Sequence, residues 1–205
     1  MTLSTTRERS EQGDAITVIL CGAAAVIVVL IANVLDFLDT FRPDGVAARV
    51  PLESGSGEGV LENTSARVSG SLSELTVVVT DLNAVSTFCL GAAIVVAALA
   101  QLVVIAAVMH LAWSFLRGRF FVRATARDFG IISWAMFLGA LGVLLLQHMG
   151  TNGVLAALGT DGREPVHPIA FWSFAPYWFA ATAVGLLSVA FRRGAQLQRD
   201  TEGLV

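Results

Sequence analysis

Lysine is absent from this chain of 205 residues, and all 13 of its basic residues are Arg. This absence excludes a Schiff-base lysine and any phosphate site that depends on an ammonium group. Charged residues are scarce too, at 14% of the chain against about a quarter in soluble domains. The two cysteines, Cys21 and Cys89, lie inside apolar runs. We interpret them as packing residues and expect neither a disulfide nor a metal pair.

Catalytic signatures are also missing from the sequence. It has no nucleophile elbow, no His-Glu-x-x-His pattern, no phosphate-binding loop and no paired-Cys metal site. No Asp, Glu or Arg lies well inside an apolar run, which argues against an ion-coupled transporter. We therefore expect no enzymatic activity, no cofactor and no direct binding to nucleic acid.

The apolar residues are concentrated in four runs, 16–35, 84–116, 129–147 and 171–191. Each has about 18 residues or more, the length at which a helix crosses a hydrocarbon core of about 30 Å. The predicted fold class is therefore an all-α membrane protein, a bundle of four transmembrane helices. Acidic residues follow the first run where a small-residue cleavage site would stand, so we interpret it as an uncleaved anchor. The second run would extend roughly 48 Å as one helix, and we expect it to protrude as a stalk.

Arginines are clustered in the N-terminal segment 1–15, in the short connection 117–128 and in the tail 192–205. Arg and Lys accumulate on the cytoplasmic side of short membrane loops. This placement predicts a multi-pass protein of the bacterial inner membrane with both termini in the cytoplasm. The segments 36–83 and 148–170 are then extracytoplasmic.

The segment 36–83 is acidic on balance and contains strand signals. Apolar residues alternate at period two in 46–52 and in 75–79, which predicts two strands, and 67–72 is a candidate for a third, shorter one. The Ser- and Gly-rich stretch 54–59 between them predicts a turn or a flexible connection. A lone hairpin is marginal in water, so we expect this small β-containing segment to pack on helix ends or on a neighbouring subunit.

Three polar residues inside the apolar runs are candidate site residues: His110, Gln101 and Asn33. His110 could relay protons or sense pH, and its alternative role is to donate to a carbonyl of a neighbouring helix. Gln101 lies nine positions earlier, about half a turn round the helix, so these two side chains cannot form one site. We expect Gln101 and Asn33 to be interhelical hydrogen-bond partners.

The connection 117–128 is the most distinctive stretch of the sequence. Its basic residues are Arg117, Arg119, Arg123 and Arg127, and the last three recur every four residues, which predicts that they share one helical face. Gly118 is expected to end the second helix. We expect these arginines to contact anionic lipid headgroups, and docking of a cytosolic partner is the alternative.

Aromatic residues gather where the fourth run begins. Trp172, Tyr177 and Trp178 are of the types that sit at the headgroup level of a bilayer, with their rings in the apolar layer and their polar tips in water. We interpret them as interfacial anchors.

A resemblance to a known family comes from three features. They are the long second run, the short Arg connection with Gly118 followed by Phe121, and a tail that reads Phe-Arg-Arg-Gly-Ala-x-Leu and ends Thr-Glu-Gly-Leu-Val. Together they resemble the bacterial DUF2975 membrane proteins, although Phe120-Phe121-Val122 replaces the Pro-Phe step of that family. The resemblance implies a four-helix inner-membrane protein of unassigned activity, often encoded beside a small helix-turn-helix regulator.

Three functions fit these features. The first is a non-enzymatic sensor or regulator that couples the extracytoplasmic segment to a cytosolic partner, such as a small helix-turn-helix regulator. The second is a homo-oligomeric channel or small-solute pore lined by the second helix. The third is an accessory subunit of an envelope complex.

Overall fold

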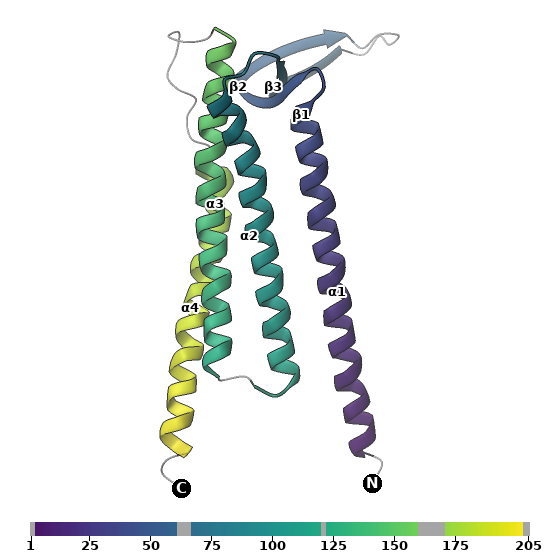
Figure 1. Ribbon diagram of the computed structural model, residues 1–205, viewed down its shortest axis with the longest axis vertical. Coiled ribbons are helices and arrows are strands. Elements are labelled where there is room, and N and C mark those ends of the chain that lie inside the picture. Colours follow the sequence, from purple (N-terminus) through teal and green to yellow (C-terminus); the bar gives the residue numbers. More distant parts are fainter. Residues whose placement is uncertain (1–2, 61–66, 120–121, 160–170, 203–205) are drawn as a thin grey trace. The chain divides into compact units, whose positions relative to one another are not determined.

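Four long helices and a three-stranded sheet make up the computed structural model of the protein, which describes residues 3–60, 67–119, 122–159 and 171–202. The elements follow in the order α1 Leu3–Thr40, β1 Phe41–Arg42, β2 Gly45–Val60, β3 Arg67–Val79, α2 Ala84–Leu116, α3 Arg123–Ala157 and α4 Phe171–Glu202 (Figure 1). All four helices are long and apolar enough to cross a membrane. This confirms the predicted helical fold with a small sheet between the first two helices.

Three of the four helices extend beyond the apolar run that predicted them, whereas α2 coincides with its run. α1 begins at Leu3, and α3 includes residues that the sequence assigned to the connections 117–128 and 148–170. Hydropathy marks only the apolar part of a helix, whereas the helix continues as long as its backbone hydrogen bonds do. The four lengths, 38, 33, 35 and 32 residues, also show that α2 is not exceptionally long. The last helix continues into the tail 192–205, because α4 ends at Glu202.

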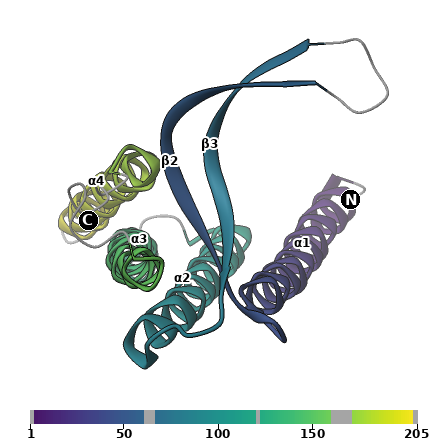
Figure 2. The same ribbon diagram turned by 90° about the horizontal axis from the view of Figure 1, so that it is seen from above.

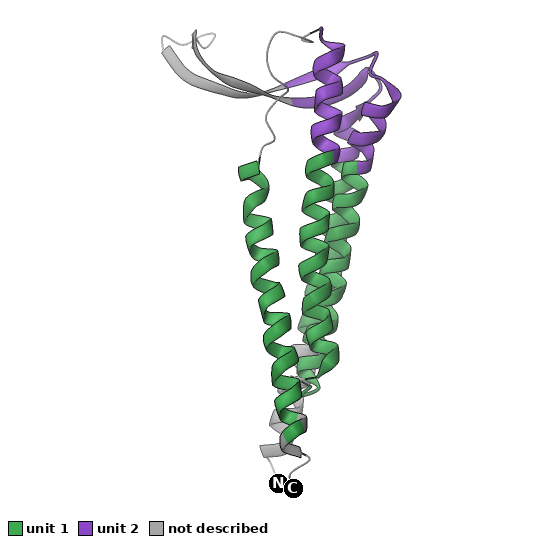
Figure 3. Ribbon diagram, turned by 90° about the vertical axis from the view of Figure 1, so that its left-hand side faces the viewer, with its two compact units in different colours: residues 1–35, 93–145, 169–205 green, residues 36–92, 146–168 purple. Residues whose placement is uncertain are grey.

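The chain divides into two compact units, which Figure 3 colours separately. Unit 1 consists of residues 1–35, 93–145 and 169–205. Unit 2 consists of residues 36–92 and 146–168, and it contains the sheet. Both α2 and α3 therefore contribute residues to each unit without a break in the helix.

The sheet of unit 2 is antiparallel, with the strand order β1-β2-β3. β2 and β3 form one long hairpin that pairs from Val46↔Val79 to Val60↔Arg67, with a register shift between Pro51 and Gly55 (Figure 2). The predicted turn at 54–59 and the separate strand at 67–72 are therefore wrong. Ser and Gly side chains show no apolar alternation, but strand pairing requires only backbone N–H and C=O groups.

The core of unit 2 joins this sheet to two helices. Ala48 of β2 and Val79 of β3 cluster with the fully buried Val154 of α3, and Leu90 of α2 packs against them. The expectation that the sheet packs on helix ends is confirmed. Because two strands and two helices share the cluster, the base of the hairpin is held by apolar burial as well as by backbone hydrogen bonds.

The core of unit 1 lies between α2, α3 and α4. Ala107 and Leu111 of α2 cluster with Ile132 of α3, and Val184 of α4 packs against this cluster. Small residues allow the backbones to approach closely, since a Cβ added at Gly139 of α3 would lie 2.5 Å from the Cβ of Ala100 on α2. α1 contacts the same unit through Gly22, whose missing side chain leaves room for Met109.

Candidate functional site

The end of α2 is closed by a turn that requires glycine. Gly118 has φ +69°, its N–H donates to the carbonyl of Phe115 (2.9 Å), and the N–H of Arg119 donates to the carbonyl of Ser114 (3.0 Å). This bond pattern is a Schellman motif, which satisfies the free carbonyls at the end of a helix. The prediction that Gly118 ends the second helix is confirmed.

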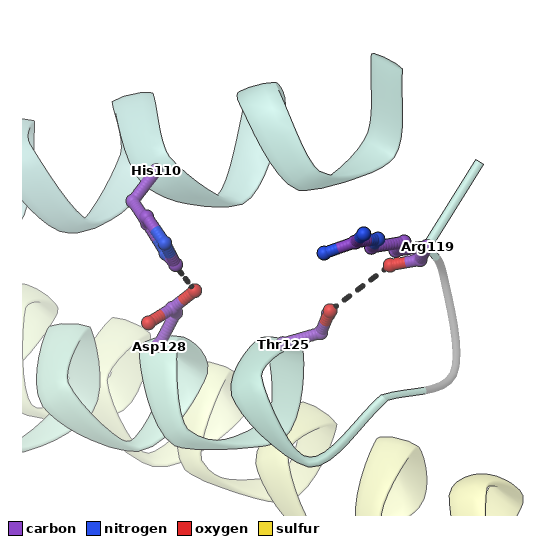
Figure 4. A network of polar contacts seen from close by, with 4 residues as sticks. All are labelled: His110, Arg119, Thr125 and Asp128. Carbon is purple, nitrogen blue, oxygen red and sulfur yellow. Dashed lines mark hydrogen bonds and ion pairs between the residues drawn. The ribbon is translucent and has the colours of Figure 1, made fainter. Parts of the chain in front are cut away.

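A histidine and a carboxylate meet just before this turn. His110 Nδ1 of α2 lies 2.7 Å from Asp128 Oδ2 of α3 (Figure 4). The Asp128 side chain is 4% exposed, and that of His110 is 52% exposed. With Asp128 ionised its oxygens only accept, so Nδ1 donates the hydrogen bond. The partner of His110 is therefore a side chain and not the carbonyl that the sequence suggested.

Sequence reasoning missed Asp128 because it assigned this residue to the polar connection. In the structure α3 begins at Arg123, so Asp128 lies in the second turn of a helix and points at α2. Nearby, the hydroxyl of the fully buried Thr125 donates to the carbonyl of Arg119 (3.2 Å), which ties the turn to α3 (Figure 4). The pair is thus a direct side-chain hydrogen bond between α2 and α3.

The basic residues of 117–128 do not share one face. α2 ends at Leu116 and α3 begins at Arg123, so the helical spacing of Arg119 with Arg123 and Arg127 has no meaning across the turn. Arg117 packs over the ring of Trp113, with 4.6 Å between its Cζ and the ring centroid. The predicted three-Arg face is therefore wrong.

Two of these arginines instead join a third from a distant part of the chain. Arg123 and Arg127 of α3 line a cleft with Arg192 of α4. The two helices that form the cleft are joined by Ser188 of α4, whose buried hydroxyl donates to the carbonyl of Ala126 on α3 (2.7 Å). The Phe-Arg-Arg step at 191–193 was the one sign in the sequence that basic residues gather at this end of α4. Nothing in the sequence indicated that they would lie beside Arg123 and Arg127.

Asn33 and Gln101 are hydrogen bonded to each other. Asn33 Nδ2 of α1 donates to Gln101 Oε1 of α2 (2.9 Å) and to the carbonyl of Val29 (2.8 Å). This bond links α1 to α2 within unit 1. Gln101 and His110 thus have partners on different helices, as their half-turn separation requires.

The aromatic residues near the start of α4 have two kinds of surroundings. Trp172 and Tyr177 are exposed. Trp178 is half-buried, and its ring lies 5.1 Å from that of Phe171 and 6.0 Å from that of Phe137. Its buried Nε1 has no hydrogen-bond partner among the described residues. Trp178 is therefore packed between rings within unit 1, whereas the side chains of Trp172 and Tyr177 are open, and the anchoring role of all three stays a prediction.

Within the described ranges, no three His, Cys, Asp or Glu side chains are grouped closely enough to hold a metal ion. Neither a family model nor a curated protein nor a solved structure matches the chain. The functional interpretation therefore rests on the residues themselves.

Proposed function

We propose that this chain is a multi-pass protein of the bacterial inner membrane and a non-enzymatic sensor or regulator. Its termini and the turn at Gly118 lie in the cytoplasm, and the β2–β3 hairpin lies outside. The four helices that are long and apolar enough to cross a membrane, and the Arg placement, support this topology. The resemblance to DUF2975 proteins adds a cytosolic helix-turn-helix regulator as the expected partner.

One observation carries the regulatory role. α2 and α3 are unbroken helices that pack with the sheet in unit 2 and carry His110, Asp128 and the turn at Gly118 in unit 1. The regulatory role would carry a change at the base of the hairpin to the turn along these two helices, and their continuity in the chain supports it. The pore hypothesis has less support, because Gln101, the polar residue it needs on α2, is bonded to Asn33.

The topology predicts which positions a membrane-impermeant maleimide can reach. With Cys21 and Cys89 replaced by Ala, Asp44→Cys in the turn between β1 and β2 is expected to be labelled in intact cells. Arg119→Cys is expected to be labelled only after permeabilisation. Both positions are exposed, so a difference between them reports sidedness rather than burial. Labelling of both positions in intact cells would contradict the topology.

The regulatory role predicts that the hairpin is required for signalling but not for folding. Arg49 and Thr76 are paired residues, so replacing residues 50–75 by Asn-Gly leaves a two-residue hairpin loop that suits the strand twist. Ala48 and Val79 of the core are retained. In host cells this short-hairpin variant is expected to accumulate normally, yet to give the transcript profile of the deletion strain.

A second variant tests the cytoplasmic end. Arg119→Glu reverses an exposed charge at the turn and is expected to reproduce the deletion profile, because it repels the cytosolic partner. The matched control is Arg193→Glu, at an exposed arginine of α4, which is expected to restore the wild-type profile.

For the hairpin experiment, full complementation of the deletion strain by the short-hairpin variant would show that the hairpin carries no signal.

A further inference from the structure

Three arginines line one cleft where α3 begins and α4 approaches its end. The cleft has a volume of about 440 Å³ and is lined by Arg123, Ala126, Arg127, Arg192, Ala195 and Gln196. None of these lining residues carries a carboxylate. Among the described residues, none of the three arginines forms an ion pair with a carboxylate. Like charges held together repel one another, so the cleft favours an anion.

The arginines are brought together by fixed packing of two helices. Ser188 is buried on α4 and is bonded to the carbonyl of Ala126, and Arg192 follows it by one helical turn. Gly130 of α3 faces the same residue, and a Cβ there would make an ordinary contact of 3.5 Å with the Ser188 hydroxyl. The backbone positions of Arg127 and Arg192, which line the same two cavities, are therefore set by helix packing and not by an anion.

An apolar groove continues from the same arginines. Its volume is about 690 Å³, and it shares Ala126, Arg127 and Arg192 with the cleft. It runs over α2 and α3 between apolar side chains that include Val96, Leu99, Val103, Ile131, Trp134 and Leu138. All of these residues belong to unit 1. An occupant of both cavities thus needs an anionic head and a long apolar tail.

We propose that this site binds an anionic phospholipid of the surrounding bilayer, with its phosphate in the arginine cleft and an acyl chain in the groove. Arg binds phosphate with two parallel hydrogen bonds. An acyl chain loses little by entering the groove, because it exchanges contacts with other acyl chains for contacts with apolar side chains. The inference rests on the proposed membrane insertion, and it names Arg192 and the groove as parts of the lipid contact.

Trp134 provides a probe, because it lines the groove and is 63% exposed. In a variant with Trp113, Trp172 and Trp178 replaced by Phe, its fluorescence is measured in phosphatidylcholine vesicles. Brominated phosphatidylglycerol is expected to reach half-maximal quenching at an about tenfold lower mole fraction than brominated phosphatidylcholine. Combining Arg127→Gln with Arg192→Gln is expected to abolish this preference. Arg193→Gln removes a charge that does not line the cavity, and it is expected to keep the preference.

Two further measurements separate the possible failures. Ala135→Phe fills the groove without changing charge and is expected to lower the preference, so the result does not depend on the arginine variants alone. A single Trp placed by Leu186→Trp, at an exposed position outside both cavities, reports insertion and is expected to be quenched equally by both lipids. Equal quenching of Trp134 by both lipids overturns the lipid site. If neither Trp is quenched, membrane insertion itself is overturned. If the Trp at position 186 is quenched but Trp134 is quenched by neither lipid, then protein and not lipid covers the groove.

Discussion

His110→Leu is expected to destabilise the protein by about 3 kcal/mol, because it leaves the Asp128 carboxylate buried without its partner. Asp128 is 4% exposed, and its only hydrogen bond among the described side chains is to His110 Nδ1 (2.7 Å). At 4% exposure, the Asp128 carboxylate has little contact with water that could replace the lost bond. The free energy of unfolding, measured by denaturant titration in detergent micelles, reports this loss.

A double variant tests whether the loss of stability arises from the His110–Asp128 pair or from His110 alone. His110→Leu combined with Asp128→Leu leaves no buried charge, and it is expected to recover about 2 kcal/mol relative to His110→Leu alone. Asp128→Asn keeps an acceptor for the His110 N–H and is expected to cost less than Asp128→Leu. If the losses of the two single leucine variants simply add in the double variant, the two side chains are not coupled.

The four helices could be predicted from the sequence because their central parts are continuous apolar runs. Their ends could not, since residues such as those at 148–157 continue α3 through backbone hydrogen bonds that hydropathy does not report. Only the base of the sheet could be predicted, because only there do apolar side chains mark the strands. The apolar alternation ending at Val79 marked the base of the hairpin, whereas Gly55 and Gly57 continue β2 with no side-chain signal.

The candidate site was harder to predict, because its residues come from different helices. Gly118 was recognised because glycine readily adopts the positive φ of a helix-ending turn. The same turn invalidated the spacing argument for Arg119, since two helices with a turn between them have no common face. The pairing of His110 with Asp128, and of Arg127 with Arg192, depends on how each helix is rotated about its axis. A single sequence of apolar helices fixes that rotation poorly.

Among the described glycines, Gly153 in unit 2 leaves the least room for a side chain, and it gives the second large expected effect. A Cβ at Gly153 of α3 would overlap the hydroxyl of Ser86 on α2 and lie 2.5 Å from its Cβ. Ser86 is 5% exposed, and Val154 next to Gly153 is fully buried in the core that holds the sheet. Gly153→Ala is therefore expected to destabilise the protein by about 3 kcal/mol, although Ala is ordinarily the better helix former.

Compensation on the opposite helix tests the cause. Ser86→Gly removes the overlapping side chain but keeps the backbone N–H, which donates to Asn83 Oδ1 (2.8 Å) and caps α2. Combined with Gly153→Ala it is expected to recover most of the lost free energy of unfolding. Gly130→Ala on the same helix is the matched control, because its Cβ would make an ordinary contact with the Ser188 hydroxyl, at 3.5 Å, and it is expected to cost less. If Ser86→Gly gives no recovery, the loss does not arise at this contact, and the close approach of α2 and α3 is not what holds the hairpin base in place.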